Sequence, residues 1–354
     1  MVMSRYLAET LGLRKWSEYM GKLVVYVTKP FPLIGNIAFG LIDRGTNVIQ
    51  VRPTTICPIS CIFCSVDSGP LSKRRQTEYI VDYKWLVKQV EEVARFKGGD
   101  IQVLIDGVGD PFTYPWLPRL VKFLKDTGIV KIVAAETHGA TLTREQIDKL
   151  DEAGLDRINL SIETFNVEKA RRLASSEWFN VRKIIKLAEY IVKETNIDLH
   201  VTPVWLPGIN DKDVIEIVKW AYRIGAGKRW PPATIQKFIY HKWGRKPSGV
   251  REISWNRYWR WIRSLEKELG VKVSWSMKEW GMRYARKIAH PFKKGNKLET
   301  LLAGPGWLRG EYLVVDNLLR RNITVVGLRS PAPREKIYVE IIRDKDGIFL
   351  ARPL

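Results

Sequence analysis

The sequence predicts an α/β fold, namely a partial (β/α)6 TIM-like barrel of parallel strands followed by a small C-terminal antiparallel β-barrel. Two observations lead to this prediction. Between about residues 47 and 240, short apolar runs alternate with longer stretches of helical period, the pattern of parallel strands joined by helices. After about residue 300 the helical period stops, and strand-like runs follow one another directly, which indicates a separate antiparallel unit.

Six apolar runs are the expected strands of the large unit. They lie at residues 47–54, 100–106, 129–137, 155–163, 197–205 and 233–239. The helical stretches between them lie at residues 82–98, 116–128, 143–154, 179–195 and 211–225. Several of these stretches end in glycine, a common helix stop. Because six strands are fewer than the eight of a closed barrel, we expect a partial one with its ligands at the C-terminal strand ends.

The strand-like runs at the end of the chain have their own boundaries. They lie at residues 311–319, 322–330, 335–344 and 347–354, separated by Pro331, Pro333 and the turn sequence DKDG. We therefore expect four parts of the chain. These are an N-terminal extension (1–46), the partial barrel (47–240), a basic, tryptophan-rich helical segment (241–300) and an OB-like β domain (301–354).

Positive charge is concentrated in one segment. The chain has a formal net charge of +21, and residues 228–297 hold 19 Lys and Arg against 4 Asp and Glu, with seven of the 14 tryptophans. Such a segment favours nucleic acid, because cations neutralise phosphates and indole rings stack on unpaired bases. A lysine-rich surface of the kind found in heat-stable proteins is the alternative. The candidate RNA contacts are Lys242, Arg245, Lys246, Arg257, Arg260 and Arg263.

Trp255 and Trp259 stand one helical turn apart inside this segment. That spacing fits two side chains that stack on bases, and it equally fits two anchors in the core beneath an amphipathic helix. Both interpretations stay open.

All three cysteines of the chain, Cys57, Cys61 and Cys64, lie within eight positions. An odd, clustered set argues against a disulfide framework. The N-terminus lacks an apolar signal core, and no run approaches 18 apolar residues. We therefore expect a cytoplasmic protein without a membrane partner.

The cysteine spacing C-x3-C-x2-C favours a [4Fe–4S] cluster. Three thiolates can hold three of its irons and leave the fourth open to another ligand. Zinc is the alternative, but a structural zinc takes four ligands. The four histidines that could supply the fourth, His138, His200, His241 and His290, show no ligand-like pairing with the cysteines.

With Phe63 directly before the last cysteine, this motif resembles the signature of the radical S-adenosylmethionine (SAM) enzymes. The resemblance implies that the amino and carboxylate groups of SAM chelate the open iron. It also implies that the reduced cluster cleaves the sulfonium to give a hydrogen-abstracting 5′-deoxyadenosyl radical, and that Phe63 contacts the adenine side. An electron donor such as ferredoxin or flavodoxin is then an expected partner.

Further motifs resemble this family, and its molybdenum-cofactor cyclase branch in particular, over about residues 45–240. DGVGDP resembles the glycine-rich turn whose carbonyls approach the methionine ammonium, with Asp110 in place of the usual glutamate. ETHGATLT, LDRINLSIETFN and LPGINDKD follow the next three strands in the order of that branch. The implied SAM contacts are Gly107, Gly109, Asp110, Pro111, Thr137, His138, Ser161 and Glu163.

The absence of other cysteines narrows the chemistry. Second clusters, sulfur insertion and methyl relay through a thiol all need cysteines that this chain does not have. No catalytic acid, base or hydrogen donor is assigned, although Glu136, His138, Tyr240 and His241 lie near strand ends.

Residues from about 305 to 354 resemble, more loosely, the TRAM module that grips RNA in several modifying enzymes. We therefore expect an enzyme that modifies a nucleotide in RNA, with transfer RNA as the first candidate. The alternatives are the same radical chemistry on a small-molecule cofactor precursor, and a zinc-bearing RNA-binding module without catalysis.

Overall fold

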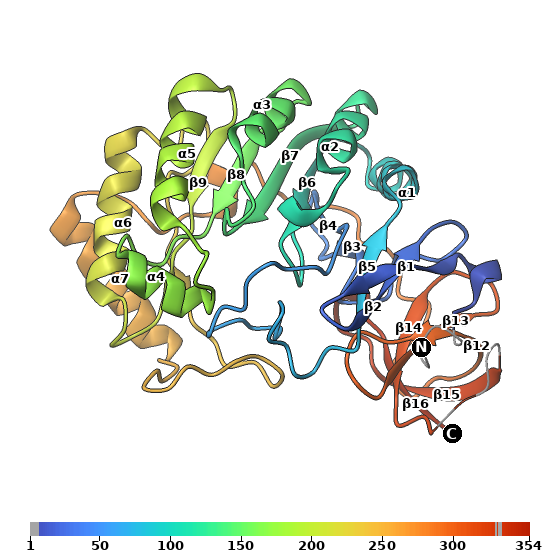
Figure 1. Ribbon diagram of the computed structural model, residues 1–354. Helices are drawn as coiled ribbons and strands as arrows, with labels where there is room; N and C mark the ends of the chain where they lie inside the picture. The colour runs from blue at the N-terminus through green and yellow to red at the C-terminus, as the bar shows by residue number, and fades with distance from the viewer. Residues whose placement is uncertain (1–6, 330, 332–334) are drawn as a thin grey trace. The chain divides into compact units, whose positions relative to one another are not determined.

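The computed structural model describes residues 7–329, 331 and 335–354 (Figure 1). The first six residues of the expected N-terminal extension and Pro333 lie outside this part. The chain divides into two compact units. Unit 1 comprises the residues up to 56, residues 72–131 and those from 284 onward, and unit 2 comprises residues 57–71 and 132–283.

Unit 1 begins with strands that the sequence did not predict. β1 pairs antiparallel with β2, which pairs parallel with β5; β3 pairs antiparallel with β4, which pairs parallel with β6. Their bounds are β1 Leu13–Tyr19, β2 Lys22–Val27, β3 Gly40–Asp43, β4 Val48–Arg52, β5 Thr77–Val81 and β6 Ile101–Ile105. Two helices follow within the unit, α1 (Tyr83–Phe96) and α2 (Leu117–Asp126), and they pack on each other. The expected N-terminal extension therefore contains three strands, β1, β2 and β3, whereas β4 and β6 are the strands expected at 47–54 and 100–106.

The C-terminal part of unit 1 is a closed five-stranded barrel of order β12-β13-β14-β16-β15. Its strands are β12 Lys297–Pro305, β13 Glu311–Asp316, β14 Asn322–Val326, β15 Lys336–Arg343 and β16 Leu350–Pro353. A small barrel was expected, but it starts with an additional strand, β12. Its strands are also not all antiparallel, since β16 closes the barrel beside β14 in parallel.

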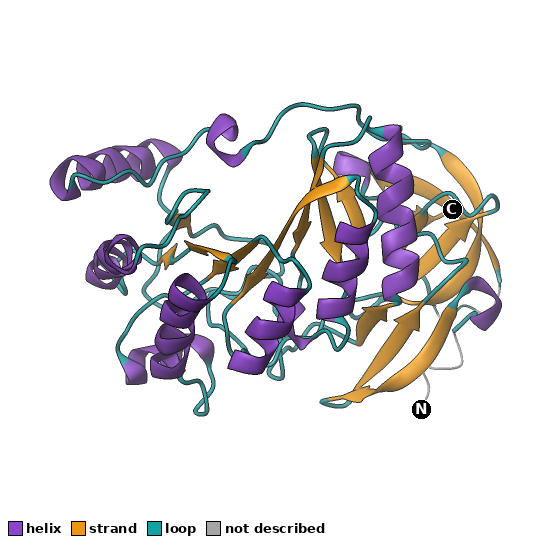
Figure 2. Ribbon diagram, turned by 90° about the horizontal axis from the view of Figure 1, so that it is seen from above, coloured by secondary structure: helices purple, strands orange, loops and turns teal. Residues whose placement is uncertain are grey.

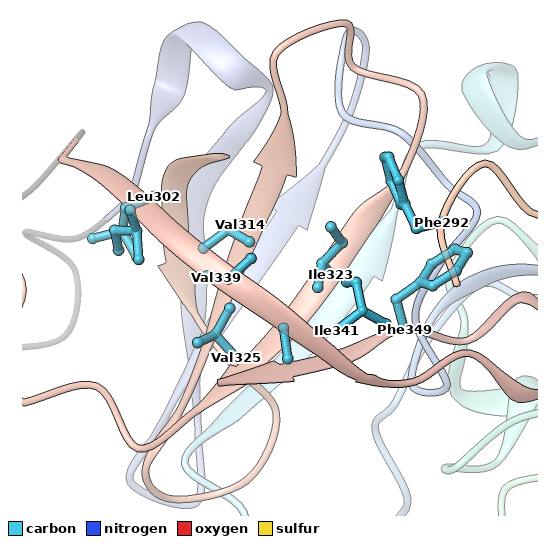
Figure 3. Close-up of a cluster of buried hydrophobic side chains, with 10 residues drawn as sticks. Phe292, Leu302, Val314, Ile323, Val325, Val339, Ile341 and Phe349 are labelled. Atoms are coloured by element: carbon cyan, nitrogen blue, oxygen red, sulfur yellow. The ribbon is translucent and has the colours of Figure 1, made fainter. Parts of the chain in front are cut away.

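An apolar core fills this barrel (Figure 3). Alternate residues of the strands point inward, among them Val314 of β13, Ile323 of β14 and Val339 of β15, all fully buried. Phe349 lies edge-to-face against Phe292, with ring centroids 5.6 Å apart. The barrel interior is thus occupied by side chains rather than by a ligand cavity.

Unit 2 carries the remaining parallel strands. β8 (Arg157–Leu160) pairs in parallel with both β7 (Val130–Thr137) and β9 (Asp198–Val201). The strand expected at 233–239 is the short β11 (Gln236–Lys237), parallel to β10 (Val204–Trp205) and preceded by a parallel bridge between Val201 and Ala233. The strand order is β3-β4-β6 in unit 1 and β7-β8-β9 in unit 2, so within each unit the parallel strands follow the chain as predicted.

Helices join the strands of unit 2 (Figures 1 and 2). They are α3 Arg144–Glu152, α4 Val167–Ala174, α5 Val181–Glu194, α6 Asp211–Ile224 and α7 Trp255–Leu269. Helices α5 and α6 pack on β9, and α3 packs on α5. All five helices predicted between the strands lie within two residues of their expected ends, whereas the eight-residue α4 was not predicted. No helix in the described part of the chain is long and apolar enough to cross a membrane.

Candidate cofactor site and basic aromatic surface

The three cysteines lie on one loop of unit 2, residues 57–71, which we call the Cys loop. Cys57 and Cys61 are buried, Cys64 is partly exposed, and all three are free thiols. Two backbone hydrogen bonds attach the loop to the end of α4, from the N–H of Ser60 to the carbonyl of Ala174 (3.0 Å) and from Ile62 to Leu173 (2.9 Å). The unpredicted helix α4 is therefore the support on which the first half of the Cys loop rests.

Arg245 holds the second half of the Cys loop. Its backbone N–H donates to the carbonyl of Cys64 (2.8 Å), and its guanidinium donates to the carbonyls of Cys61 (3.1 Å) and Ser68 (2.6 Å). The same guanidinium pairs with Asp67, with Nε 2.9 Å from Oδ1. The preceding Gly244 lies so close that a Cβ there would stand 2.9 Å from the carbonyl oxygen of Ser65. One arginine of the basic segment is thus engaged with the Cys loop.

The environment of Cys61 opposes an isolated thiolate. Burial raises its pKa well above the ordinary value, the charges of Glu163, Cys57 and Cys64 raise it further, and Arg245 lowers it. Thiols that lie this close together become thiolates readily when cationic iron binds them. Among the described residues, no three His, Cys, Asp or Glu side chains converge on a single metal ion. In a [4Fe–4S] cluster each thiolate binds a different iron, so such convergence is not required, and the three thiols fit the cluster.

A pocket in unit 2 adjoins Cys61, and its lining includes His138, Glu163 and Phe179. The Glu163 Oε1 atom is buried and has no hydrogen-bond partner among the described residues. Burial raises the pKa of Glu163, while His138, whose Nδ1 lies 3.9 Å from Oε2, lowers it. A buried acceptor facing a pocket fits a ligand that brings its own hydroxyl donors. Glu163 is one of the SAM contacts that the resemblance implies.

The other predicted SAM contacts of unit 2 lie near this pocket or at the strand ends. Phe63 is buried, with its ring centroid 6.4 Å from that of His138. The hydroxyls of Ser161 and Thr202 lie 3.1 Å apart at the ends of β8 and β9. The Thr137 hydroxyl accepts a hydrogen bond from the N–H of Gly139 and so shapes the turn after β7.

The glycine-rich turn DGVGDP lies in unit 1, after β6. A Cβ on Gly109 would lie 2.3 Å from the carbonyl oxygen of Ile56 and 2.4 Å from that of Thr55, so only glycine allows this approach. Asp110 is buried, and its side chain accepts the N–H of Phe112 as the N-cap of a 3-10 turn that begins at Pro111. The shorter acid in place of glutamate therefore shapes its own turn.

Helix α7 presents two different faces. Tyr258, Ile262 and Leu265 are buried beneath it, and Trp261 stacks on Trp205 with ring centroids 3.7 Å apart. Trp255 and Trp259 are 52% and 40% exposed and lie roughly parallel to each other. Arg257, Arg260 and Arg263 are also exposed. We call these five exposed side chains (Trp255, Arg257, Trp259, Arg260 and Arg263) the α7 surface. Trp255 and Trp259 are thus not core anchors.

Lys242 and Lys246, the other predicted RNA contacts, are exposed and lie over the rings of Trp243 (4.5 Å) and Tyr240 (5.4 Å). Tyr240 and His241 are exposed as well. Sequence reasoning missed the attachment of Arg245 to the Cys loop. The one local signal for it is Gly244, a glycine inside a cationic run.

Comparisons with known proteins indicate the family of the chain. A family model described as the Radical SAM superfamily matches residues 51–221. The chain is 33% identical to Uncharacterized protein MJ0103 of Methanocaldococcus jannaschii, over 95% of this chain and 82% of that protein. It is 26% identical to the GTP 3′,8-cyclase of Chlorobaculum tepidum, over half of each chain. The solved structure titled "Native anSMEcpe with bound AdoMet" is similar in fold, with a TM-score of 0.50 and 15% identity over 64% of this chain and 62% of that one.

Proposed function

We propose that this chain, which belongs to the radical SAM superfamily, modifies a nucleotide in RNA, with transfer RNA as the first candidate. The cofactors of the family are a [4Fe–4S] cluster and SAM. When bound, they supply reductive cleavage of the sulfonium and a 5′-deoxyadenosyl radical that abstracts hydrogen. We propose a ferredoxin or flavodoxin as the electron donor and Cys57, Cys61 and Cys64 as the ligands of three irons.

In this proposal, the residues around the cysteines hold and orient the cofactors. Phe63 lies on the adenine side, and Glu163 offers its unpartnered Oε1 to the ribose hydroxyls. The narrow approach at Gly109 lets the backbone of the glycine-rich turn face the methionine end. Burial of Cys57 and Cys61 excludes water from two of the three cluster ligands.

The α7 surface is the observation that supports RNA as the substrate. Three exposed arginines and two exposed indole rings lie on one helix of the unit that holds the cysteines. Arginines bind the phosphate backbone, and exposed rings stack on bases that leave a helix. A buried core cannot use such a face, and a small substrate does not need one.

We further propose that the C-terminal barrel is a TRAM-like module that contributes to RNA binding. Its closed β-barrel, filled with apolar side chains, has the size and strand content of small nucleic-acid-binding barrels. The match to GTP 3′,8-cyclases favours a small nucleotide-like substrate instead, and this chain spans about half the length of those relatives.

RNA binding measured against salt concentration separates the two substrates. Replacing Arg257, Arg260 and Arg263 by glutamine is expected to reduce the magnitude of the slope of log K against log salt by about two to three, since each phosphate contact contributes roughly 0.7 to 0.9. The matched control replaces Arg182, Lys183 and Lys186, three exposed cations of α5 in the same unit, and is expected to keep the wild-type slope.

A small-molecule substrate would give a different result. The α7 variant would then retain full turnover, and the wild-type protein would show no salt-sensitive RNA binding while still cleaving SAM. Mass spectrometry of nucleosides from cells lacking this protein identifies the product, because one modified nucleoside should disappear from their RNA.

A further inference from the structure

Unit 1 contains a fully buried arginine that the proposed function does not use. The side chain of Arg75 has no exposed surface, and its Nη1 lies 3.0 Å from Oε2 of Glu78, which is itself 1% exposed. A buried guanidinium is costly to desolvate, and one carboxylate does not satisfy its five donors. Its remaining contacts therefore indicate what holds it in place.

Two of those contacts are backbone carbonyls, one just before the Cys loop and one within the glycine-rich turn. The Arg75 Nη1 donates to the carbonyl of Thr55 at 2.7 Å, and Nη2 donates to the carbonyl of Val108. Thr55 stands two residues before Cys57 in the sequence, and Val108 is the middle of DGVGDP. One guanidinium thus connects the segment that follows β4 with the glycine-rich turn, which packs against the same segment at Gly109.

The C-terminal barrel covers the other side of Arg75. The guanidinium carbon lies 4.7 Å from the ring centroid of Trp307, in the loop between β12 and β13. Gln76 strengthens this attachment, since its backbone N–H donates to the carbonyl of Trp307 (3.1 Å) and its side chain donates to that of Gly306 (3.0 Å). The barrel loop and the turn are therefore attached to the same short segment.

We infer that Arg75 is a positioning residue through which the C-terminal barrel holds the glycine-rich turn in the geometry that binds SAM. The inference rests on the proposed role of that turn in SAM binding, but not on RNA as the substrate. The Val108 carbonyl already accepts a hydrogen bond from Arg75 and is therefore not available to a cationic ligand. In this inference, a shift of the barrel loop that carries Trp307 displaces Arg75, and Arg75 in turn displaces the glycine-rich turn.

The test measures SAM affinity by calorimetry on the anaerobically reconstituted protein, together with Tm and iron content. Replacing Arg75 by Met and Glu78 by Gln removes both charges of the pair, so neither partner is left as an unpaired buried ion. We expect the Kd for SAM to rise about tenfold, the equivalent of one lost charge-assisted hydrogen bond. Trp307→Leu, a change in the barrel, is expected to raise it several-fold, and Arg75→Lys should fall between wild type and the double variant.

The matched control is another buried ion pair of unit 1, Lys97 and Asp43, whose Nζ and Oδ1 atoms lie 2.8 Å apart. Lys97→Met with Asp43→Asn should lower Tm without changing the Kd for SAM. If the Arg75 double variant only lowers Tm in the same way, Arg75 is merely structural and the inference is wrong. Should the double variant not fold, Trp307→Leu and Arg75→Lys decide, and wild-type affinity in both overturns it.

Gly109→Ala separates failure of this inference from failure of the proposed site. Unchanged SAM affinity in Gly109→Ala would mean that the turn does not bind SAM at all. Weakened affinity in Gly109→Ala, together with wild-type affinity in the Arg75 and Trp307 variants, would instead reject the coupling to the barrel alone.

Discussion

Replacing Arg245 by methionine should loosen the Cys loop and the cluster it holds. Methionine keeps much of the apolar length of the side chain but loses every guanidinium contact. These contacts are the hydrogen bonds to the carbonyls of Cys61 and Ser68 and the ion pair with Asp67. The backbone bond from residue 245 to Cys64 remains available, so the variant tests the side chain alone.

The magnitude follows from the burial of this cluster of contacts. The side chains of Arg245 and Asp67 are 18% and 8% exposed, so solvent screens their interaction only in part. Hydrogen bonds to charged groups contribute roughly 1.5 to 3 kcal/mol each, and their effects on one loop are not additive. We therefore expect the loop to lose about 3 kcal/mol of local stability, which is about a hundredfold increase in its open population.

Two measurements test this expectation. Hydrogen exchange of residues 57–71 in the protein without iron reports the opening of the loop, independently of cofactor. Iron and sulfide content after reconstitution, and the rate of cluster loss to a chelator, report its consequence. Arg245→Lys keeps a charge but not the planar fork, so it should give an intermediate result.

Lys246→Met is the matched control, because Lys246 is exposed and its ammonium lies over Tyr240. It should weaken RNA binding while leaving exchange in the Cys loop and the cluster content unchanged. The reasoning fails if Arg245→Met keeps wild-type exchange and cluster content and loses only as much RNA affinity as Lys246→Met. Arg245 would then act as the RNA contact that the sequence predicted.

Two further predictions concern packing and pH. Gly109→Ala places a Cβ 2.3 Å from the Ile56 oxygen, so chemical denaturation should show a loss of about 2 kcal/mol or more in the free energy of unfolding. Gly107→Ala, whose Cβ has its nearest contact at 3.3 Å, should lose less. The pKa of His200 is lowered to about 3, chiefly by burial and in smaller part by the Arg157 charge, while the hydrogen bond to the Pro231 carbonyl opposes this shift. Because the folded pKa lies below the unfolded value of about 6.5, the unfolded chain binds a proton at His200 before the folded protein does. The contribution of His200 to the free energy of unfolding is therefore complete above about pH 6.5 and declines as pH falls towards 3. From pH 7 to 5.5 the free energy of unfolding should fall by about 1 kcal/mol through this group. Urea unfolding should show a smaller loss in His200→Gln, and the full loss in the exposed control His241→Gln. Equal pH dependence in wild type and His200→Gln would contradict the assignment.

The parallel strands and their helices could be predicted because their signals are local. β6 is buried at four of its five positions and is apolar except for Gln102, while the side chains of Asp82 and Thr143 cap α1 and α3. β1 was missed for the opposite reason. Five of its seven residues are exposed, so no alternation marks it, and only the partner β2 makes it a strand.

The cysteines were predicted as a site because their spacing is itself the signal, whereas Arg245 and Arg75 were not predicted as positioning residues. Arg245 reaches a carbonyl 184 positions away, and Trp307 lies over a guanidinium more than 200 positions distant. Contacts of that separation leave no periodic pattern in a single sequence. They depend on which carbonyls the fold leaves without a donor, which only the folded backbone determines.

Not all cations of the basic segment are free to bind RNA, so the net charge of the segment overstates its phosphate contacts. Arg245 is engaged with the Cys loop, and Lys237, whose side chain is 2% exposed, pairs with Glu252 at 2.7 Å. Neither can release counterions as an exposed arginine of the α7 surface does, because each already neutralises a carboxylate of this chain. The slope of log K against log salt should therefore reflect only the exposed cations. Its magnitude should be much smaller than the value that the full net charge of the segment would give. A slope that approached the full charge would mean that these internal pairs open when RNA binds, and that the Cys loop is released with them.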